Sequence, residues 1–133
     1  MQARRAPLSW APFPTDGRHV LAALLILVIL VVFAGIALAT LVLRGRHVPL
    51  AVSSLHGLAG IIAIVLLVMH DLHFPHNMPI NAATVLLILT ATGGLLLFGF
   101  RAGRQPLPGL VVGLHGGFAV VALVLMIVGY ITA

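Results

Sequence analysis

Four long apolar stretches, separated by short polar segments, dominate the pattern of this chain. They cover residues 20–43, 48–69, 80–100 and 107–131. Each reaches the ~20 residues that a helix needs to cross the hydrocarbon layer of a membrane. The pattern predicts an all-α membrane protein, with a four-helix transmembrane bundle over residues 20–133. Residues 1–19 are predicted to form an ordered or surface-lying tail at the interface, because the apolar run after them is too long for the core of a secretory signal.

The second half of the chain repeats the first at a fixed offset of 59 positions. Pro, His, Gly and Ala coincide in the second and fourth stretches, in the pairs Pro49 and Pro108, His56 and His115, Gly57 and Gly116, and Ala63 and Ala122. The first and third stretches match as well, with Gly35 on Gly94. We therefore predict two helical hairpins, about 20–70 and 79–131, related as parallel repeats by a pseudo-twofold axis along the membrane normal. The second and fourth helices then face each other, with His56 and His115 at one depth.

Composition excludes an ordinary soluble domain. The 133 residues are 62% hydrophobic and 7% charged, and so small a core could not hide that much apolar surface from water. The high isoelectric point reflects a scarcity of acids and gives no basic patch for nucleic acid. The absence of Cys excludes disulfides, iron–sulfur clusters and covalent haem attachment through Cys-x-x-Cys-His, so any haem would be bound noncovalently.

The distribution of Arg predicts the orientation in the membrane. Arg44 and Arg46 lie between the first two stretches, and Arg101 and Arg104 between the last two. By the positive-inside rule these connections are cytoplasmic and both termini lie outside, although Arg4, Arg5 and Arg18 near the N-terminus favour the opposite orientation. The Lys-free composition is typical of GC-rich bacterial genomes, which points to a bacterial inner membrane.

The matched histidines are the main candidates for chemistry. An imidazole inside a membrane helix is costly without a partner, so His56 and His115 are functional candidates. Two facing neutral imidazoles suit the axial positions of a haem iron. Small neighbours leave room for a flat macrocycle, and we predict a cofactor site that also contains Gly57, Gly60, Gly116 and Ala119. The structural alternative is a hydrogen bond from each imidazole to a neighbouring helix, with Thr40, Ser53, Ser54 and Thr90 as candidate partners.

His70 follows His56 by fourteen positions, which places the two about 40° apart around the helix and about 21 Å apart along it. With His115, this pattern resembles the membrane cytochromes b, including the cytochrome b561-like four-helix proteins, whose second and fourth helices carry the haem ligands. The fourth helix departs from that pattern, because Gly129 stands where the partner of His70 would be. The resemblance therefore implies one haem b per chain, ligated by His56 and His115, and electron transfer between a quinone pool and a redox partner.

The segment after the second stretch is a further candidate site. His70, Asp71, His73 and His76 could together bind Zn²⁺ or Cu²⁺, which accept nitrogen and oxygen ligands. The alternative is a polar loop at the level of the lipid headgroups. A third role for His70 or His73 is contact with a haem propionate or proton exchange with a quinone.

Two other classes of function stay open. One is a non-catalytic accessory subunit of a larger respiratory or photosynthetic complex, whose glycine faces pack against neighbours and whose histidines ligate a chlorophyll-type magnesium singly. The other is a transporter, which the near absence of intramembrane acids and bases makes less attractive. We find no catalytic motif, so an electron-transfer subunit is a better prediction than a stand-alone enzyme.

Overall fold

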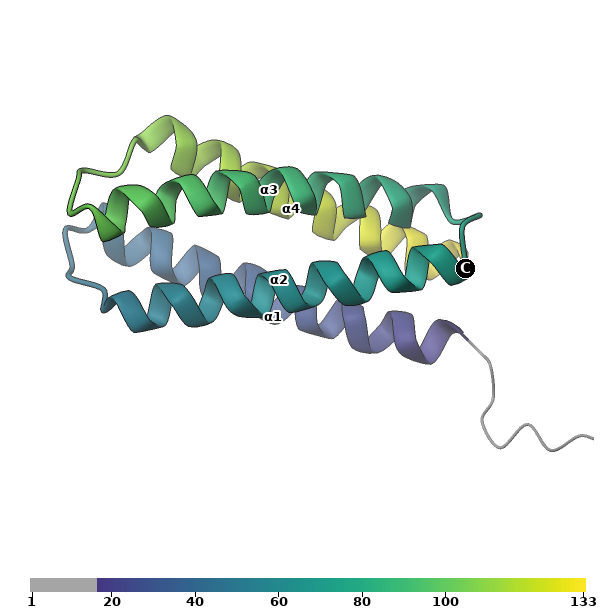
Figure 1. Cartoon of the computed structure of the whole chain (residues 1–133). Coiled ribbons are helices and arrows are strands. Elements are labelled where there is room, and N and C mark those ends of the chain that lie inside the picture. The colour runs from purple at the N-terminus through teal and green to yellow at the C-terminus, as the bar shows by residue number, and fades with distance from the viewer. Residues whose placement is uncertain (1–16) are drawn as a thin grey trace, which may run out of the picture.

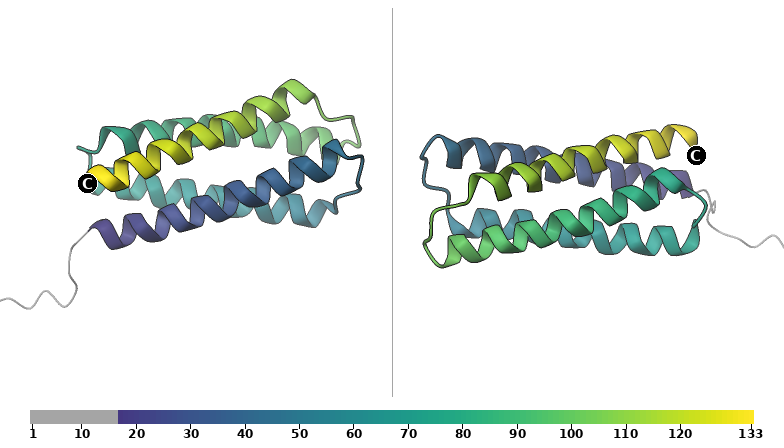
Figure 2. Two further views of the ribbon diagram at one scale, coloured as in Figure 1. Left: turned by 180° about the vertical axis from the view of Figure 1, so that it is seen from behind. Right: turned by 90° about the horizontal axis from the view of Figure 1, so that it is seen from above.

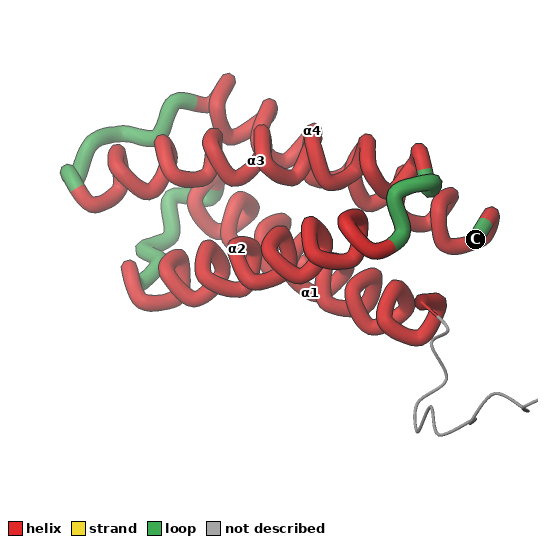
Figure 3. Tube along the Cα trace, turned by 45° about the vertical axis from the view of Figure 1, so that its right-hand side comes forward, coloured by secondary structure: helices red, strands yellow, loops and turns green. Residues whose placement is uncertain are grey.

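The computed structural model describes residues 17–133 and contains four helices in chain order. They are α1 (Gly17–Leu43), α2 (Leu50–His73), α3 (Met78–Ala102) and α4 (Gly109–Thr132), joined by short connections (Figures 1 and 3). Each is long and apolar enough to cross a membrane, and the described residues form no strand. The predicted all-α, four-helix transmembrane architecture is confirmed.

The helices form a four-cornered bundle in which each helix packs on two neighbours. α1 packs on α2 and α4, and α3 packs on the same two helices, so α2 and α4 lie on one diagonal (Figures 1 and 2). The most extensive contact joins α3 to α4. The prediction that the second and fourth helices oppose each other across the centre is therefore confirmed.

The repeat is also visible in how the first helix of each hairpin ends. After α1, the Arg46 amide donates to the Leu41 carbonyl and the Gly45 amide to the Val42 carbonyl, with Gly45 at a φ of 67°. After α3, Gln105 donates to Phe100 and Arg104 to Arg101, and Arg104 has a φ of 55°. Both are Schellman motifs, which satisfy the last carbonyls of a helix through one residue in the left-handed conformation. Equivalent positions thus have equivalent backbone geometry.

The two ends of the bundle differ in charge. Both connections that carry Arg residues lie at one end, whereas the α2–α3 connection, the start of α1 and the C-terminus lie at the other (Figures 1 and 2). At this second end the Arg18 guanidinium lies 5.7 Å from the centre of the Tyr130 ring, which joins α1 to α4. We call the two ends the arginine end and the terminal end.

The tightly packed core lies toward the terminal end. Leu21, Leu67, Ile80 and Met126, one from each helix, are its largest fully buried side chains. The outer faces are apolar too, with Leu30, Leu55 and Leu95 between 62% and 71% exposed. Such surfaces suit lipid rather than water, and the chain is an integral, multi-pass membrane protein.

The predicted element boundaries need two corrections. α2 continues to His73, so His70, Asp71 and His73 lie on its last turns and not in the connection after it. The helix ends at His73, with Phe74 as its C-cap at a φ of −129°, because Pro75 disfavours helical geometry in the residue before it. α1 begins at Gly17, inside the predicted tail of residues 1–19, and the rest of that tail lies outside the described residues.

Packing at the terminal end generates a stability prediction. A Cβ added to Gly129 would lie 2.5 Å from Cδ1 of Ile80 and 2.9 Å from Oδ1 of Asn77. We expect Gly129→Ala to lower the free energy of unfolding by about 1–3 kcal/mol through overpacking. Thermal unfolding in detergent, followed by circular dichroism, measures this effect. Gly113→Ala is the control, because nothing lies within 4 Å of its added Cβ, and equal stability of the two variants would contradict the packing.

Candidate functional site

His56 of α2 and His115 of α4 meet at the centre of the bundle. Their ring centres are 6.4 Å apart and the ring planes are inclined at 77°. The backbones of α2 and α4 make no close approach along this diagonal, so the two side chains reach into the space between the hairpins. The predicted meeting of the two histidines across the pseudo-twofold axis is confirmed.

A glycine of the neighbouring helix lies beside each imidazole. A Cβ at Gly35 of α1 would lie 3.1 Å from Cε1 of His56, and a Cβ at Gly94 of α3 would lie 2.8 Å from Cε1 of His115. Any larger residue at either position would push the ring away. The two glycines occupy equivalent places in the repeat, so each hairpin supplies both a histidine and the space for its ring.

The hydrogen bonds of the two rings differ. Nδ1 of His115 lies 2.8 Å from the Thr90 carbonyl oxygen. A carbonyl only accepts, so Nδ1 of His115 donates and Nε2 keeps a free lone pair. Nδ1 of His56 is buried and has no partner. Of the four candidate partners that the sequence offered, only Thr90 bonds a histidine, and it does so through its main-chain carbonyl. The hydroxyls of Thr40, Ser54 and Thr90 instead donate to carbonyls of their own helices.

The histidines border a cavity of about 490 Å³ that is lined by all four helices and is largely apolar. Its size and walls are those of a small-molecule or cofactor site. All the predicted cofactor-binding residues line it, namely His56, Gly57, Gly60, His115, Gly116 and Ala119. Added Cβ atoms at Gly57 and Gly116 would meet nothing within 4 Å, so these glycines leave open space beside the histidines.

Arg101 supplies a positive charge at the arginine end of this cavity. Its Nη2 donates to the Val48 carbonyl, which links α3 to the α1–α2 connection. Its Nε is buried and has no partner. A buried N–H without an acceptor is costly, so this guanidinium is suited to an anionic group placed in the cavity.

His56 and His115 could together hold the metal of a tetrapyrrole. Their ring centres are 6.4 Å apart on an apolar cavity with glycines beside them, and the His56 ring would turn its nitrogen toward the metal. The bond from His115 to a main-chain carbonyl is the usual outer contact of a metal-bound histidine. The residues present therefore fit a haem with two histidine ligands.

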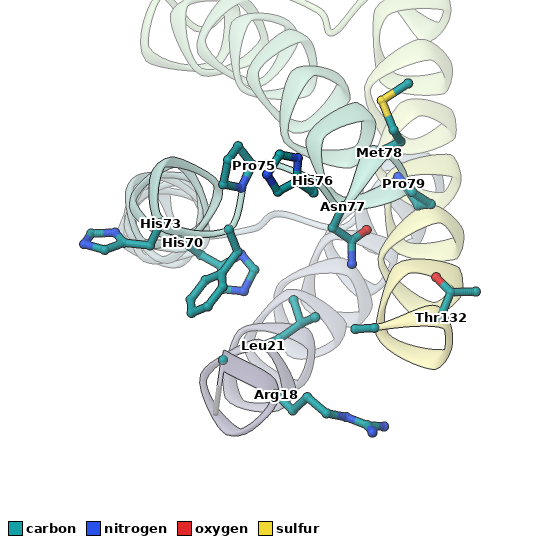
Figure 4. Close-up of a pocket in the computed structure, with 13 residues that line it drawn as sticks. Arg18, Leu21, His70, His73, Pro75, His76, Asn77, Met78, Pro79 and Thr132 are labelled. Carbon is teal, nitrogen blue, oxygen red and sulfur yellow. The ribbon is translucent and has the colours of Figure 1, made fainter. Parts of the chain in front are cut away.

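The second predicted metal site is not assembled. His70 Nδ1 lies 3.4 Å from Asp71 Oδ1, Asp71 accepts a 2.6 Å hydrogen bond from the Thr84 hydroxyl, and Nδ1 of His73 lies 2.7 Å from the Met69 carbonyl. Figure 4 shows His73 pointing away from His76, next to a cavity of about 710 Å³ at the terminal end. Between residues 17 and 133, no group of three or more His, Cys, Asp or Glu side chains lies close enough together to hold a metal ion. Metal binding by His70, Asp71, His73 and His76 stays a prediction.

At the terminal end, Gly129 rather than a histidine stands at the position that matches His70. His70 is 6% exposed, and its ring centre lies 5.0 Å from that of Phe74. The space opposite, at Gly129, is filled by Ile80 and by Asn77, which donates to the Gly129 carbonyl. The number of haems per chain stays a prediction.

Gly35 and Gly94 belong to the site, although sequence reasoning assigned neither of them to it. The repeat contained a signal for the two glycines, because they match each other at the same offset as the histidines. From the sequence, Arg101 is one of four Arg residues, with Arg44, Arg46 and Arg104, that are candidate contacts for lipid phosphate or a haem propionate, and membrane orientation explains their charge equally well.

Comparison with known proteins gives no match to this chain among family models, curated proteins or solved structures. The fold and the site define its class, which is a four-helix integral membrane protein with a histidine-lined cavity inside the bundle.

The contact of Gly94 with His115 generates a second prediction. We expect Gly94→Ala to displace the His115 ring and to break its hydrogen bond to Thr90, because the new methyl group would overlap Cε1. ¹⁵N NMR of the histidine side chains in detergent detects loss of the Nδ1–H donor. Gly99→Ala on the same helix is the control, since its added Cβ meets nothing within 4 Å. Unchanged His115 signals in Gly94→Ala would contradict the contact.

Proposed function

We propose that this chain is a membrane-embedded b-type haem protein, or the haem-carrying subunit of a larger assembly, that transfers electrons between a quinone pool and a redox partner. The observation that carries the proposal is the pair of facing imidazoles, 6.4 Å apart, on an apolar cavity inside the membrane. Each chain would hold one haem.

In this proposal each part of the cavity has a role. His56 and His115 would hold the haem iron, while Gly35 and Gly94 give their rings room. The side chain of Arg101 would bind a propionate at the arginine end, through the Nε that has no other partner. The cofactor supplies one-electron chemistry at its iron. While both histidines hold the metal, no position would be open to oxygen, which favours electron transfer.

The position of His56 along α2 indicates how deep in the membrane the haem would lie. His56 is the seventh residue of α2, so it lies about 9 Å along the helix from the arginine end. We propose that this end faces the cytoplasm of a bacterial inner membrane, following the positive-inside rule. The haem would then lie nearer the cytoplasmic surface.

One observation favours the second candidate, an accessory subunit that packs against a larger complex. Gly109, Gly113 and Gly117 recur every four residues along α4, and added Cβ atoms at these positions would meet nothing within 4 Å. Small residues at this spacing let a second membrane helix approach closely. The two candidates are compatible if the partner is the redox complex that the haem subunit serves.

The histidine pair can be tested by substitution in the purified protein. We expect His56→Ala and His115→Ala each to abolish the low-spin haem spectrum, because each removes one of two axial ligands. His47→Ala is the control, since His47 is exposed and lies outside the cavity. A low-spin spectrum that is unchanged in both cavity variants would exclude this pair as the ligands.

The absence of Cys makes the orientation directly testable, because any introduced thiol is unique. We expect a membrane-impermeant maleimide to label Met78→Cys at the terminal end in intact cells. Gln105→Cys, at the arginine end, should react only after the membrane is opened. The reverse pattern would place the arginine end outside and overturn the proposed orientation.

A further inference from the structure

The two histidines of the pair are held differently, although the repeat makes them equivalent in sequence. The His115 ring is fixed by a 2.8 Å hydrogen bond from Nδ1 to the Thr90 carbonyl of α3. The corresponding carbonyl in the first hairpin belongs to Val31 of α1, and Nδ1 of His56 makes no hydrogen bond to it or to any other described group. One ligand candidate is anchored and the other is not.

The two rings also present different edges to their neighbouring helices. From the Cβ position at Gly94, Nδ1 of His115 is 3.3 Å away and Nε2 is 3.8 Å away. From the Cβ position at Gly35 the order is reversed, with Nε2 of His56 at 3.5 Å and Nδ1 at 4.0 Å. Nε2 of His115, the nitrogen that is free to bind a metal, therefore lies on the side of its ring away from α3. Nε2 of His56 lies on the side nearer α1, so the His56 ring must turn before Nε2 points away from α1.

The asymmetry goes with a difference in how the helices of the two hairpins pack. α4 contacts α3 more extensively than α2 contacts α1. Close approach brings His115 within reach of the Thr90 carbonyl.

We infer that, in the haem protein proposed above, His115 is the permanent iron ligand and His56 is a displaceable one. This inference rests on the proposed function. A hydrogen bond from Nδ1 to a carbonyl orients a histidine and makes its other nitrogen a stronger ligand. Loss of such an outer contact typically lowers metal affinity by about 10–100-fold. His56 is without this support from the start, so its bond to iron is the weaker of the two.

The geometry further assigns the place where another ligand would replace His56 to the α2 side of the cavity. An added Cβ at Gly57 would meet nothing within 4 Å, and one at Gly60 would meet only Cγ1 of Val31 at 3.9 Å. His56 therefore has open space into which it can swing. A small neutral ligand such as carbon monoxide or imidazole would replace it: the bond from Nε2 of His56 breaks, one bond to the incoming ligand forms, and no electron or proton moves.

The first test compares the two single variants in full-length, haem-loaded protein. We expect His56→Ala to retain haem as a five-coordinate, high-spin form, and to bind carbon monoxide after dithionite reduction at least ten times more tightly than the unmodified protein. Added imidazole should restore its low-spin spectrum. His115→Ala should lose haem during gel filtration at least ten times faster than His56→Ala does. Equal haem retention in the two variants, or the reverse order, would overturn the inference.

A second pair of variants leaves both histidines in place. Gly94→Ala should displace the His115 ring, because its added Cβ would lie 2.8 Å from Cε1, and so break the bond to Thr90 and speed haem loss at least fivefold. Gly35→Ala should displace the His56 ring, because its added Cβ would lie 3.1 Å from Cε1, and so strengthen carbon monoxide binding at least fivefold. Unchanged rates and affinities in folded protein would also overturn the inference. An unmodified protein that binds no haem would defeat the proposed function itself, whereas haem binding with equivalent histidines would defeat only this inference.

Discussion

The structure depends on the cost of placing an imidazole inside a membrane. A polar ring in hydrocarbon needs a partner, and a helix that carries one must turn it toward the interior of the bundle. This chain does so twice at the same depth, with His56 on α2 and His115 on α4. α2 and α4 lie at opposite corners of the bundle, so the two rings meet at its centre, and Gly35 and Gly94 give them space.

One half of the bundle is tightly packed, and the other half contains the histidine cavity. Toward the terminal end, Leu21, Leu67, Ile80 and Met126 fill the centre, and the described hydrogen bonds of Asp71 and Asn77 join α2 to α3 and α3 to α4. Toward the arginine end, glycines leave a cavity of about 490 Å³ around the histidines. A membrane bundle is held by close packing and interhelical hydrogen bonds, so a well-packed half can support a half that keeps space for a cofactor.

Much of this arrangement follows from the sequence, because length and repeat are strong signals. Runs of about 20 apolar residues predict spanning helices, and the shared offset of His56 and His115 predicts that the rings meet. The end of α2 was missed, since the prediction ended the helix with its apolar run, whereas Pro75 sets the limit. Unequal contacts of the histidines were out of reach, because they depend on how closely each pair of helices approaches.

Haem content of the purified protein tests the central claim most directly. The measurement is the visible spectrum of the full chain in detergent, oxidised and then reduced with dithionite, with haem quantified as the pyridine haemochrome after expression with ample haem. We predict about one haem b per chain and the split reduced spectrum of a low-spin centre with two histidine ligands. A folded, colourless protein would contradict the claim and would leave the histidine cavity to an accessory subunit.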